Sequence, residues 1–394
     1  RSATTCRCQF HMLDAALAPG GNALDAAATP SAAGGVRPCT IEDIPAVARL
    51  FRATFTDRLK AGGRPLEVLL RRELFEHPWR DPDLPSLVFA GPDGAVSGFI
   101  AVRPLRLLFD GAPVSAAVGG TLMVDKSIGN PVMGARLLRS YLNGAQDVSL
   151  SESANEISQV MWEKLGGRTE AAYSMEWLRV IKPAGLALAS LTRRSRIAAV
   201  LRPITSAVDW CAARVRANPL RIDASFDEGS DVDAEDLVDA LLALSLPYRL
   251  RPDWDRDSLL WFVAQASEKE RYGPLVCRVV RDRKGGVAGA YLYCVRPGGV
   301  AFVLDIFAAP KSAERVVDDL FADAKRRGAV AIRGRVQPEF ADLLLRRRAV
   351  FLHASSMVVH ARRSDLFAPI HGGEALITGL AGESWSALIG GLFI

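Results

Sequence analysis

The chain has 394 residues, of which 49% are hydrophobic and 24% are charged, and its formal net charge is +5. This composition predicts a globular protein of about two domains, and no apolar run approaches the roughly 18 residues that a membrane-spanning helix needs. The mild positive charge suits an anionic ligand, but scattered arginines and few aromatic residues argue against nucleic acid as a partner.

The cysteines and the N-terminal tail indicate the expected environment. The six cysteines form no C-x-x-C pair and have no metal-ligand spacing with histidine. We therefore expect reduced thiols, no metal and a cytoplasmic protein. Residues 1–35 are rich in Ala, Gly, Ser and Thr, which predicts a disordered tail without the compact apolar core of a signal peptide.

The first expected elements are a strand, two helices and a meander of three strands. Thr40 can cap the first helix, while Gly91-Pro-Asp-Gly and Asp110-Gly111 are turn signals between the meander strands. The predicted ranges are 36–40 (strand), 41–55 and 65–76 (helices), and 87–90, 95–106 and 114–124 (strands).

One stretch, Val118–Leu142, carries the strongest functional signal. The apolar run Val118–Val124 predicts a buried strand, the polar loop Asp125–Met133 contains glycine, and a helix follows from Gly134. A strand, a glycine-bearing loop and a helix aim free backbone N–H groups at an anion. We interpret the stretch as a cradle for the pyrophosphate of an acyl-CoA.

The first half continues with a strand at 148–151, a helix at 155–165 that Gly166-Gly167 ends, and a strand at 172–181. In this order, residues 36–181 resemble the GNAT superfamily of acyl-CoA-dependent N-acyltransferases. The residues that carry the resemblance are Ile41–Phe51, Ala95–Ile100, Val124–Leu138 and Asn155–Gly166.

The resemblance implies how a donor would bind. The loop after strand 114–124 would bind pyrophosphate through backbone amides, and a splayed gap between strands 114–124 and 148–151 would admit the pantetheine arm. It implies acetyl-CoA or another acyl-CoA as donor and a small-molecule amine as acceptor. The residues expected to hold the cofactor are Leu122, Met123, Val124, Lys126, Ser127, Ile128, Gly129, Asn130, Met133, Gly134, Ala135, Asn155, Ser158 and Trp162.

The sequence departs from the family pattern at two places. The family's loop usually reads Arg/Gln-x-x-Gly-x-Gly/Ala, so either Gly129 takes the first glycine position or a longer loop precedes a helix opened by Gly134-Ala135. We favour the second alignment, because Pro131 suits a loop or a first helical turn. Trp162 stands where the family often has the tyrosine that protonates the leaving thiolate, and an indole cannot do so.

Two carboxylates are candidates for the base that accepts the amine proton. Glu152 follows strand 148–151 and borders the expected gap, so we rank it first; its alternative role is to cap the next helix. Asp125 follows strand 114–124 and has loop capping as its alternative.

The second half repeats the order of elements. Helices in 231–268 precede strands at 275–280, 287–295 and 300–307, a helix at 312–327, a strand at 329–333, a helix at 338–347 and a strand at 356–359. We predict an α/β (α+β) protein with two GNAT-like mixed-sheet domains in tandem, the second degenerate. The predicted organisation is a tail (1–35), an acyl-CoA-binding domain (36–181), a basic helical linker (182–225) and a second domain (226–394). The second domain is expected to lack CoA binding, because its loop Ala308–Arg315 has no glycine.

Residues 182–222 combine many basic side chains with apolar ones, as at Arg193, Arg194 and Arg196. Such a segment can dock on an acidic carrier protein or a membrane surface, or it can be a linker whose arginines are solvated.

Three functions remain open at this point. The leading one is an N-acyltransferase that moves an acyl group, with acetyl as the first candidate, from acyl-CoA to an amine by direct attack in a ternary complex. The others are a non-catalytic acyl-CoA-sensing or scaffold module and a membrane-surface acyl or aminoacyl transferase of the cell-envelope type.

Overall fold

The computed structural model describes residues 34–55, 65–125, 127, 132–194, 205, 209, 220–223 and 225–389. By its internal contacts the chain divides into two compact units. Unit 1 comprises residues 1–170 and 356–368, and unit 2 comprises residues 171–355 and 369–394. Each unit is built on one mixed sheet.

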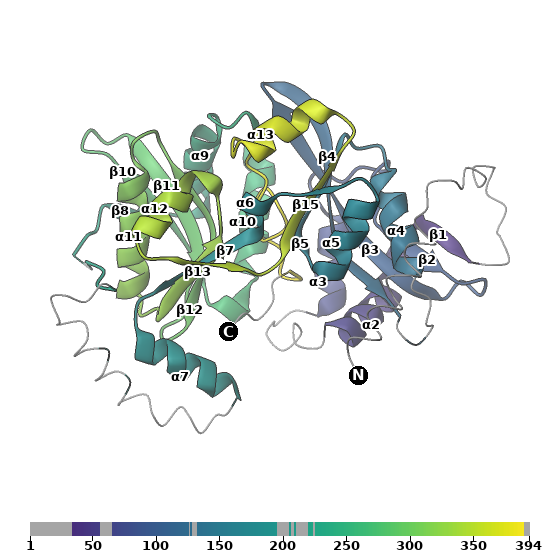
Figure 1. Cartoon of the computed structure of the whole chain (residues 1–394), viewed down its shortest axis with the longest axis horizontal. Helices are drawn as coiled ribbons and strands as arrows, with labels where there is room; N and C mark the ends of the chain where they lie inside the picture. Colours follow the sequence, from purple (N-terminus) through teal and green to yellow (C-terminus); the bar gives the residue numbers. More distant parts are fainter. Residues whose placement is uncertain are drawn as a thin grey trace. The chain divides into compact units, whose positions relative to one another are not determined.

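Unit 1 has two helices on each face of its sheet (Figure 1). Along β3 (Val96–Phe109), Gly98 lies against Leu137 of α4 (Val132–Leu142), whereas Arg103 pairs at 2.9 Å with Glu73 of α3 (Leu66–Phe75) on the opposite face. Its elements are β1 (Gly35–Pro38), η1 (Ile41–Asp43), α2 (Ile44–Thr54), α3 (Leu66–Phe75), β2 (Leu87–Ala90), β3 (Val96–Phe109), β4 (Ala112–Val124), α4 (Val132–Leu142), β5 (Val148–Ala154), α5 (Glu156–Lys164), β6 (Arg168–Thr169), β15 (Ser356–Ala361) and η7 (Ser364–Leu366).

Unit 2 repeats this plan, with α11 (Ala313–Arg326) against one face of its sheet (Figure 1). Its elements are α6 (Ala171–Ser174), β7 (Met175–Val180), α7 (Pro183–Arg194), β8 (Gly229–Asp231), α9 (Ala234–Ser245), β9 (Leu250–Pro252), α10 (Arg256–Ser267), η5 (Glu270–Tyr272), β10 (Leu275–Arg281), β11 (Val287–Cys294), β12 (Val300–Ala308), α11 (Ala313–Arg326), β13 (Ala331–Arg335), η6 (Pro338–Phe340), α12 (Ala341–Arg346) and β14 (Val350–His353). The helix α13 (Phe367–His371) spans the boundary between the units.

The two sheets have the same order of strands. Unit 1 reads β1-β2-β3-β4-β5-β15-β6, and unit 2, read from the other end, is β8-β10-β11-β12-β13-β7-β14. In each sheet a meander leads into one parallel pair, β4 with β5 and β12 with β13. The predicted fold class, two mixed-sheet domains of the same kind in tandem, is confirmed.

The sixth strand of each sheet comes from the other half of the sequence. β15 lies between β5 and β6 in unit 1, and β7 lies between β13 and β14 in unit 2. The predicted domains, 36–181 and 226–394, therefore differ from the units: strand 172–181 belongs to the second sheet and strand 356–359 to the first. Hydrophobic patterning shows that both segments are buried strands, but it does not identify the strands with which they pair.

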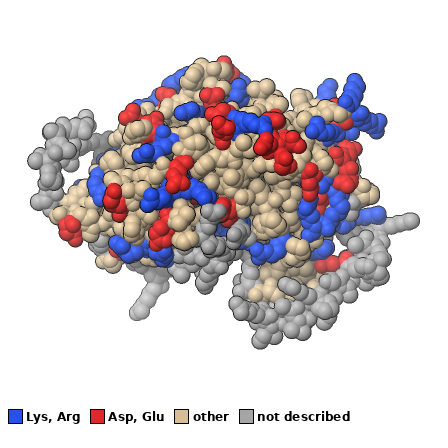
Figure 2. Space-filling model, turned by 180° about the vertical axis from the view of Figure 1, so that it is seen from behind, with Lys and Arg blue, Asp and Glu red and all other residues tan. Residues whose placement is uncertain are grey.

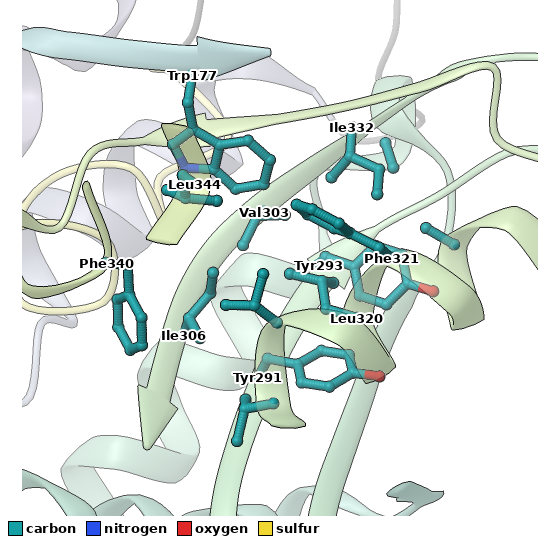
Figure 3. Packing of buried hydrophobic residues seen from close by; sticks show 14 of the residues in the cluster. Trp177, Tyr291, Tyr293, Val303, Ile306, Leu320, Phe321, Ile332, Phe340 and Leu344 are labelled. Atoms are coloured by element: carbon teal, nitrogen blue, oxygen red, sulfur yellow. The ribbon is translucent and has the colours of Figure 1, made fainter. Parts of the chain in front are cut away.

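The core of unit 2 shows that β7 is an integral part of it. Trp177 of β7 packs within 5.9 Å, centroid to centroid, of Phe321 on α11, among residues of β11, β12 and β13 (Figure 3). In unit 1, Val358 of β15 joins the core that α4 and α5 cover. Both exchanged strands thus contribute buried side chains as well as backbone pairs.

Candidate functional site

The parallel strands β4 and β5 part halfway along their length. They pair only at Ala116–Val148, Ala117–Ser149 and Val118–Leu150, although β4 continues to Val124 and β5 to Ala154. Their outer edges stay paired, β4 with β3 and β5 with β15. The predicted separation of these two strands is confirmed, and it leaves the facing edges of 119–124 and 151–154 unpaired with each other.

Tyr141 of α4 lies at the point where the strands part. Its hydroxyl donates toward the carbonyl oxygens of Ala117 on β4, at 2.6 Å, and Leu150 on β5, at 3.3 Å. A Cβ at residue 119 would lie 2.6 Å from the Tyr141 ring, so only glycine fits there. Tyr141 thus closes the base of the separation, and the ring of Trp162 packs edge-on against it at 5.8 Å.

β4 is irregular just beyond this point. The register with β3 shifts between Phe99–Met123 and Ala101–Gly120, so Thr121 and Leu122 together stand opposite Ile100 in a β-bulge. Thr121 has φ +54°, a left-handed conformation that costs a β-branched residue on the order of 1–3 kcal/mol. Its hydroxyl is buried and has no hydrogen-bond partner among the described residues.

The helix α4 begins at Val132, eight residues after β4 ends. The predicted cradle residues Lys126, Ile128, Gly129 and Asn130 lie outside the described residues. Met133 and Ala135 are buried in the core, so these two can meet a ligand only through their backbone. Gly134 faces Val124, at a distance where a Cβ would fit.

The predicted residues of α5 have structural roles. Asn155 caps the helix, because its side-chain oxygen accepts a hydrogen bond from the N–H of Ser158 at 2.9 Å. Trp162 is 2% exposed and belongs to the core beside Tyr141. The structure therefore brings Trp162 close to the base of the strand separation.

The two candidate bases lie in different surroundings. Glu152 lies inside β5, two residues past the last pair with β4, and is 1% exposed. Asp125 accepts hydrogen bonds from the N–H and hydroxyl of Ser127, which lower the pKa of its carboxyl. Asp125 is thus a loop cap, and the predicted cofactor residue Ser127 is its partner.

The corresponding strands of unit 2, β12 and β13, also part. Other residues of the same chain, however, form hydrogen bonds with β12 beyond the point where it leaves β13. β12 and β13 pair from Val300–Ala331 to Val303–Gly334. Beyond that point the side-chain amide of Gln337 accepts from Ile306 N–H at 2.9 Å and donates to Ile306 C=O at 2.8 Å. Gln337 thus occupies both backbone groups of Ile306 with one side chain.

The C-terminal segment adds to this closure. The N–H of Leu380 bonds the buried Asp305 carboxylate at 2.7 Å. A Cβ at residue 379 would lie 2.0 Å from the same carboxylate, and Gly379 has φ +65°. The segment can therefore approach β12 only because residue 379 is glycine.

Basic and acidic side chains are intermingled over most of the face in Figure 2. Most of the basic segment 182–222, including the side chains of Arg193, Arg194 and Arg196, lies outside the described residues, so its docking role stays a prediction. In the described part of this segment, Asp209 accepts hydrogen bonds from the N–H groups of Ala184 and Gly185 at the start of α7.

No group of three or more His, Cys, Asp and Glu that could hold a metal ion occurs within the described ranges. No helix there has the length and hydropathy to cross a bilayer.

Sequence reasoning missed the residues that shape the base of the strand separation. From the sequence, Tyr141 is predicted only as part of the helix after Gly134, and Gly119 and Thr121 only as part of the strand Val118–Val124. The signal for Gly119 was the Gly119-Gly120 pair inside an apolar run, since glycine in a strand often marks a bulge or a close approach. Nothing in the sequence marks Thr121.

Comparison with solved structures supports the fold. A probable N-acyltransferase from Enterococcus faecalis V583 aligns with a TM-score of 0.55 and 12% identity, covering 83% of this chain and 72% of that one. A GCN5-related N-acetyltransferase from Anabaena variabilis ATCC 29413 aligns with a TM-score of 0.54 and 12% identity, covering 83% of this chain and 72% of that one. A GCN5-related N-acetyltransferase from Kribbella flavida aligns with a TM-score of 0.52 and 13% identity, with the same two coverages.

These alignments cover more of the chain than either unit contains, so the shared fold includes parts of both. At such identities the likeness shows the fold and not the activity. No protein-family model matches the sequence, and no curated protein is significantly similar to it.

Proposed function

We propose that this chain is an acyl-CoA-dependent N-acyltransferase and that unit 1 holds the donor. The observation that carries the proposal is the parting of β4 and β5 after Val118 and Leu150, beside the start of α4. Two strand edges that do not pair with each other leave backbone groups that an extended thiol cofactor can bond. The names of the three similar structures, all N-acyl- or N-acetyltransferases, support the same reading.

In this proposal the backbone of Leu122–Val124 meets the pantetheine and thioester, and the loop before α4 meets the pyrophosphate. Backbone N–H groups at the start of α4 suit an anion, because they have no partner within the helix. The loop residues Lys126, Ile128, Gly129 and Asn130 belong to this cradle. Unit 2 lacks a donor site, because Gln337 and the C-terminal segment occupy the corresponding strand edge.

The reaction is direct attack in a ternary complex. The amine nitrogen attacks the thioester carbonyl carbon, the carbon–sulfur bond breaks, and the CoA thiolate leaves. Glu152 accepts the proton of the attacking amine, because it lies on the part of β5 that has left β4. Trp162 cannot protonate the thiolate, so water or the acceptor supplies that proton. Acetyl is the first donor to test, since Tyr141 closes the base of the separation.

Calorimetry and a turnover assay test the proposal. We expect saturable binding of acetyl-CoA and release of free CoA thiol with at least one amine in a panel. Glu152→Gln should lower turnover at least 100-fold with little change in donor affinity. Glu156→Gln, an exposed position at the start of α5, is the control and should behave as wild type. The absence of saturable heat for any acyl-CoA would contradict the proposal.

A second candidate is an acyl-CoA-binding module without turnover. The observation that favours it is that none of the three positions expected to take part in catalysis carries an exposed, unengaged proton donor or acceptor. Trp162 replaces a proton donor, Asp125 is held by Ser127, and Glu152 is buried. Donor binding without thiol release over the whole amine panel would favour this candidate over the enzyme.

A further inference from the structure

Thr121 combines two features that a purely structural residue does not need. Its backbone adopts φ +54°, although it is β-branched, and its buried hydroxyl has no hydrogen-bond partner among the described residues. Buried polar groups in folded proteins are nearly always paired, and strained backbone is concentrated at functional sites. Either feature alone is uncommon, and here both occur in one residue that is 7% exposed.

The position of Thr121 relates these features to the strand separation. It lies three residues beyond Val118, the last residue of β4 that pairs with β5. It is also the first of the two residues that form the bulge opposite Ile100. A bulge re-aims the side chains of its strand, and this one lies on the part of β4 that has left β5.

Neighbouring groups do not explain the unpaired hydroxyl. Tyr141, whose hydroxyl lies at the base of the separation, already bonds the carbonyls of Ala117 and Leu150. By contrast, the hydroxyl of Ser97 on the adjacent strand β3 contacts the sulfur of Met133 and the carbonyl of Phe89. The hydroxyl of Thr121 therefore remains a buried donor without a partner among the described residues.

We infer that the hydroxyl of Thr121 donates a hydrogen bond to the carbonyl oxygen of the bound thioester. This inference rests on the proposed function and adds to it a residue that contacts the acyl group of the donor. The hydroxyl forms no covalent bond in the reaction. Its hydrogen bond strengthens as negative charge develops on the oxygen during attack.

The test compares acetyl-CoA with CoA, because CoA lacks the carbonyl. Thr121→Val keeps the branched shape and removes the hydroxyl, whereas Thr121→Ser keeps the hydroxyl. We expect Thr121→Val to weaken acetyl-CoA binding about fivefold with CoA affinity unchanged, and to lower kcat by more than tenfold. Thr121→Ser should bind both ligands as wild type does. Should Thr121→Val fail to fold, Thr121→Ala removes the same hydroxyl and gives the same comparison.

Thr169→Val is the matched control, since the hydroxyl of Thr169, also in unit 1, already bonds Glu163 at 2.7 Å. It should leave the ratio of acetyl-CoA to CoA affinity unchanged. The inference is overturned if Thr121→Val weakens both ligands equally or changes neither binding nor kcat. If wild type binds neither acetyl-CoA nor CoA, the proposed function itself fails.

Discussion

The hydroxyl of Tyr141 lies 2.6 Å from the carbonyl oxygen of Ala117 and 3.3 Å from that of Leu150, so one helical side chain joins two strands at the point where they part. Beyond it, β4 and β5 no longer pair. The contact sets where the separation begins, because Tyr141 takes up one carbonyl from each strand. Its ring also requires glycine at position 119.

This packing predicts the effect of Gly119→Ala. The added Cβ would lie 2.6 Å from the Tyr141 ring, so we expect a loss of about 1–3 kcal/mol in the free energy of unfolding. The same change in a Tyr141→Leu background should cost clearly less, because the smaller side chain leaves room. Urea unfolding of the four proteins in this double-mutant cycle measures the coupling. Equal costs in both backgrounds would mean that Tyr141 does not exclude a side chain at 119.

Gln337→Leu tests the closure of unit 2. The change leaves the N–H and C=O of Ile306 without the side-chain bonds at 2.9 and 2.8 Å. We expect a stability loss of about 1–3 kcal/mol, with donor affinity unchanged and one donor bound per chain in both proteins. Two equivalents bound by wild type would show that unit 2 keeps a donor site.

The buried His77 predicts a pH dependence of stability. Burial lowers the pKa of His77 to about 3, and its Nδ1 accepts a hydrogen bond from the N–H of Trp79. Above pH 6.5 His77 is neutral in both states and contributes no pH dependence. Below pH 6.5 the unfolded chain binds the proton and the folded chain does not, so stability falls as the pH falls toward 3.

The measurement compares urea unfolding at pH 7.5 and pH 5. His77 should account for about 2 kcal/mol of the wild-type loss between these values. His77→Asn keeps an acceptor near the Nδ1 position. Between the two pH values its free energy of unfolding should fall by about 2 kcal/mol less than that of wild type. An identical loss in the variant would assign the pH dependence to other groups.

The exchange of β7 and β15 predicts that the sequence halves do not fold alone. A fragment of residues 34–181 lacks β15, which lies between β5 and β6 and contributes the buried Val358 and Val359. We expect this fragment to be unfolded or insoluble and to become soluble when co-expressed with residues 182–394. Cooperative unfolding of the isolated fragment would contradict the exchange.

The sequence was most informative where structure is local. Turn chemistry predicted the hairpin at Asp110-Gly111, where both residues have positive φ. The helical spacing after Val132 and the apolar run before Val124 placed α4 and β4 to within a few residues. Turns, helices and strands of this kind are determined by residues that are close together in the chain, so they can be predicted from a single sequence.

What could not be predicted depends on distant or unfavourable contacts. The pairing of β15 with β5 joins residues far apart in sequence, and a buried apolar strand fits several partners equally well. Thr121 could not be foreseen because a β-branched residue is intrinsically disfavoured at φ +54°. The side chain of Met133 fills the core, which the sequence does not show, while its place at the cofactor stays a prediction. In each case the tertiary context overrides the local preference.

The most direct test of the central claim is a crystal structure of the full chain with acetyl-CoA. The account predicts the pantetheine along residues 119–124 of β4, with β4 and β5 still paired only up to Val118 and Leu150, and the pyrophosphate at the start of α4. Donor bound in unit 2, or β4 and β5 paired along their whole length in the complex, would contradict it.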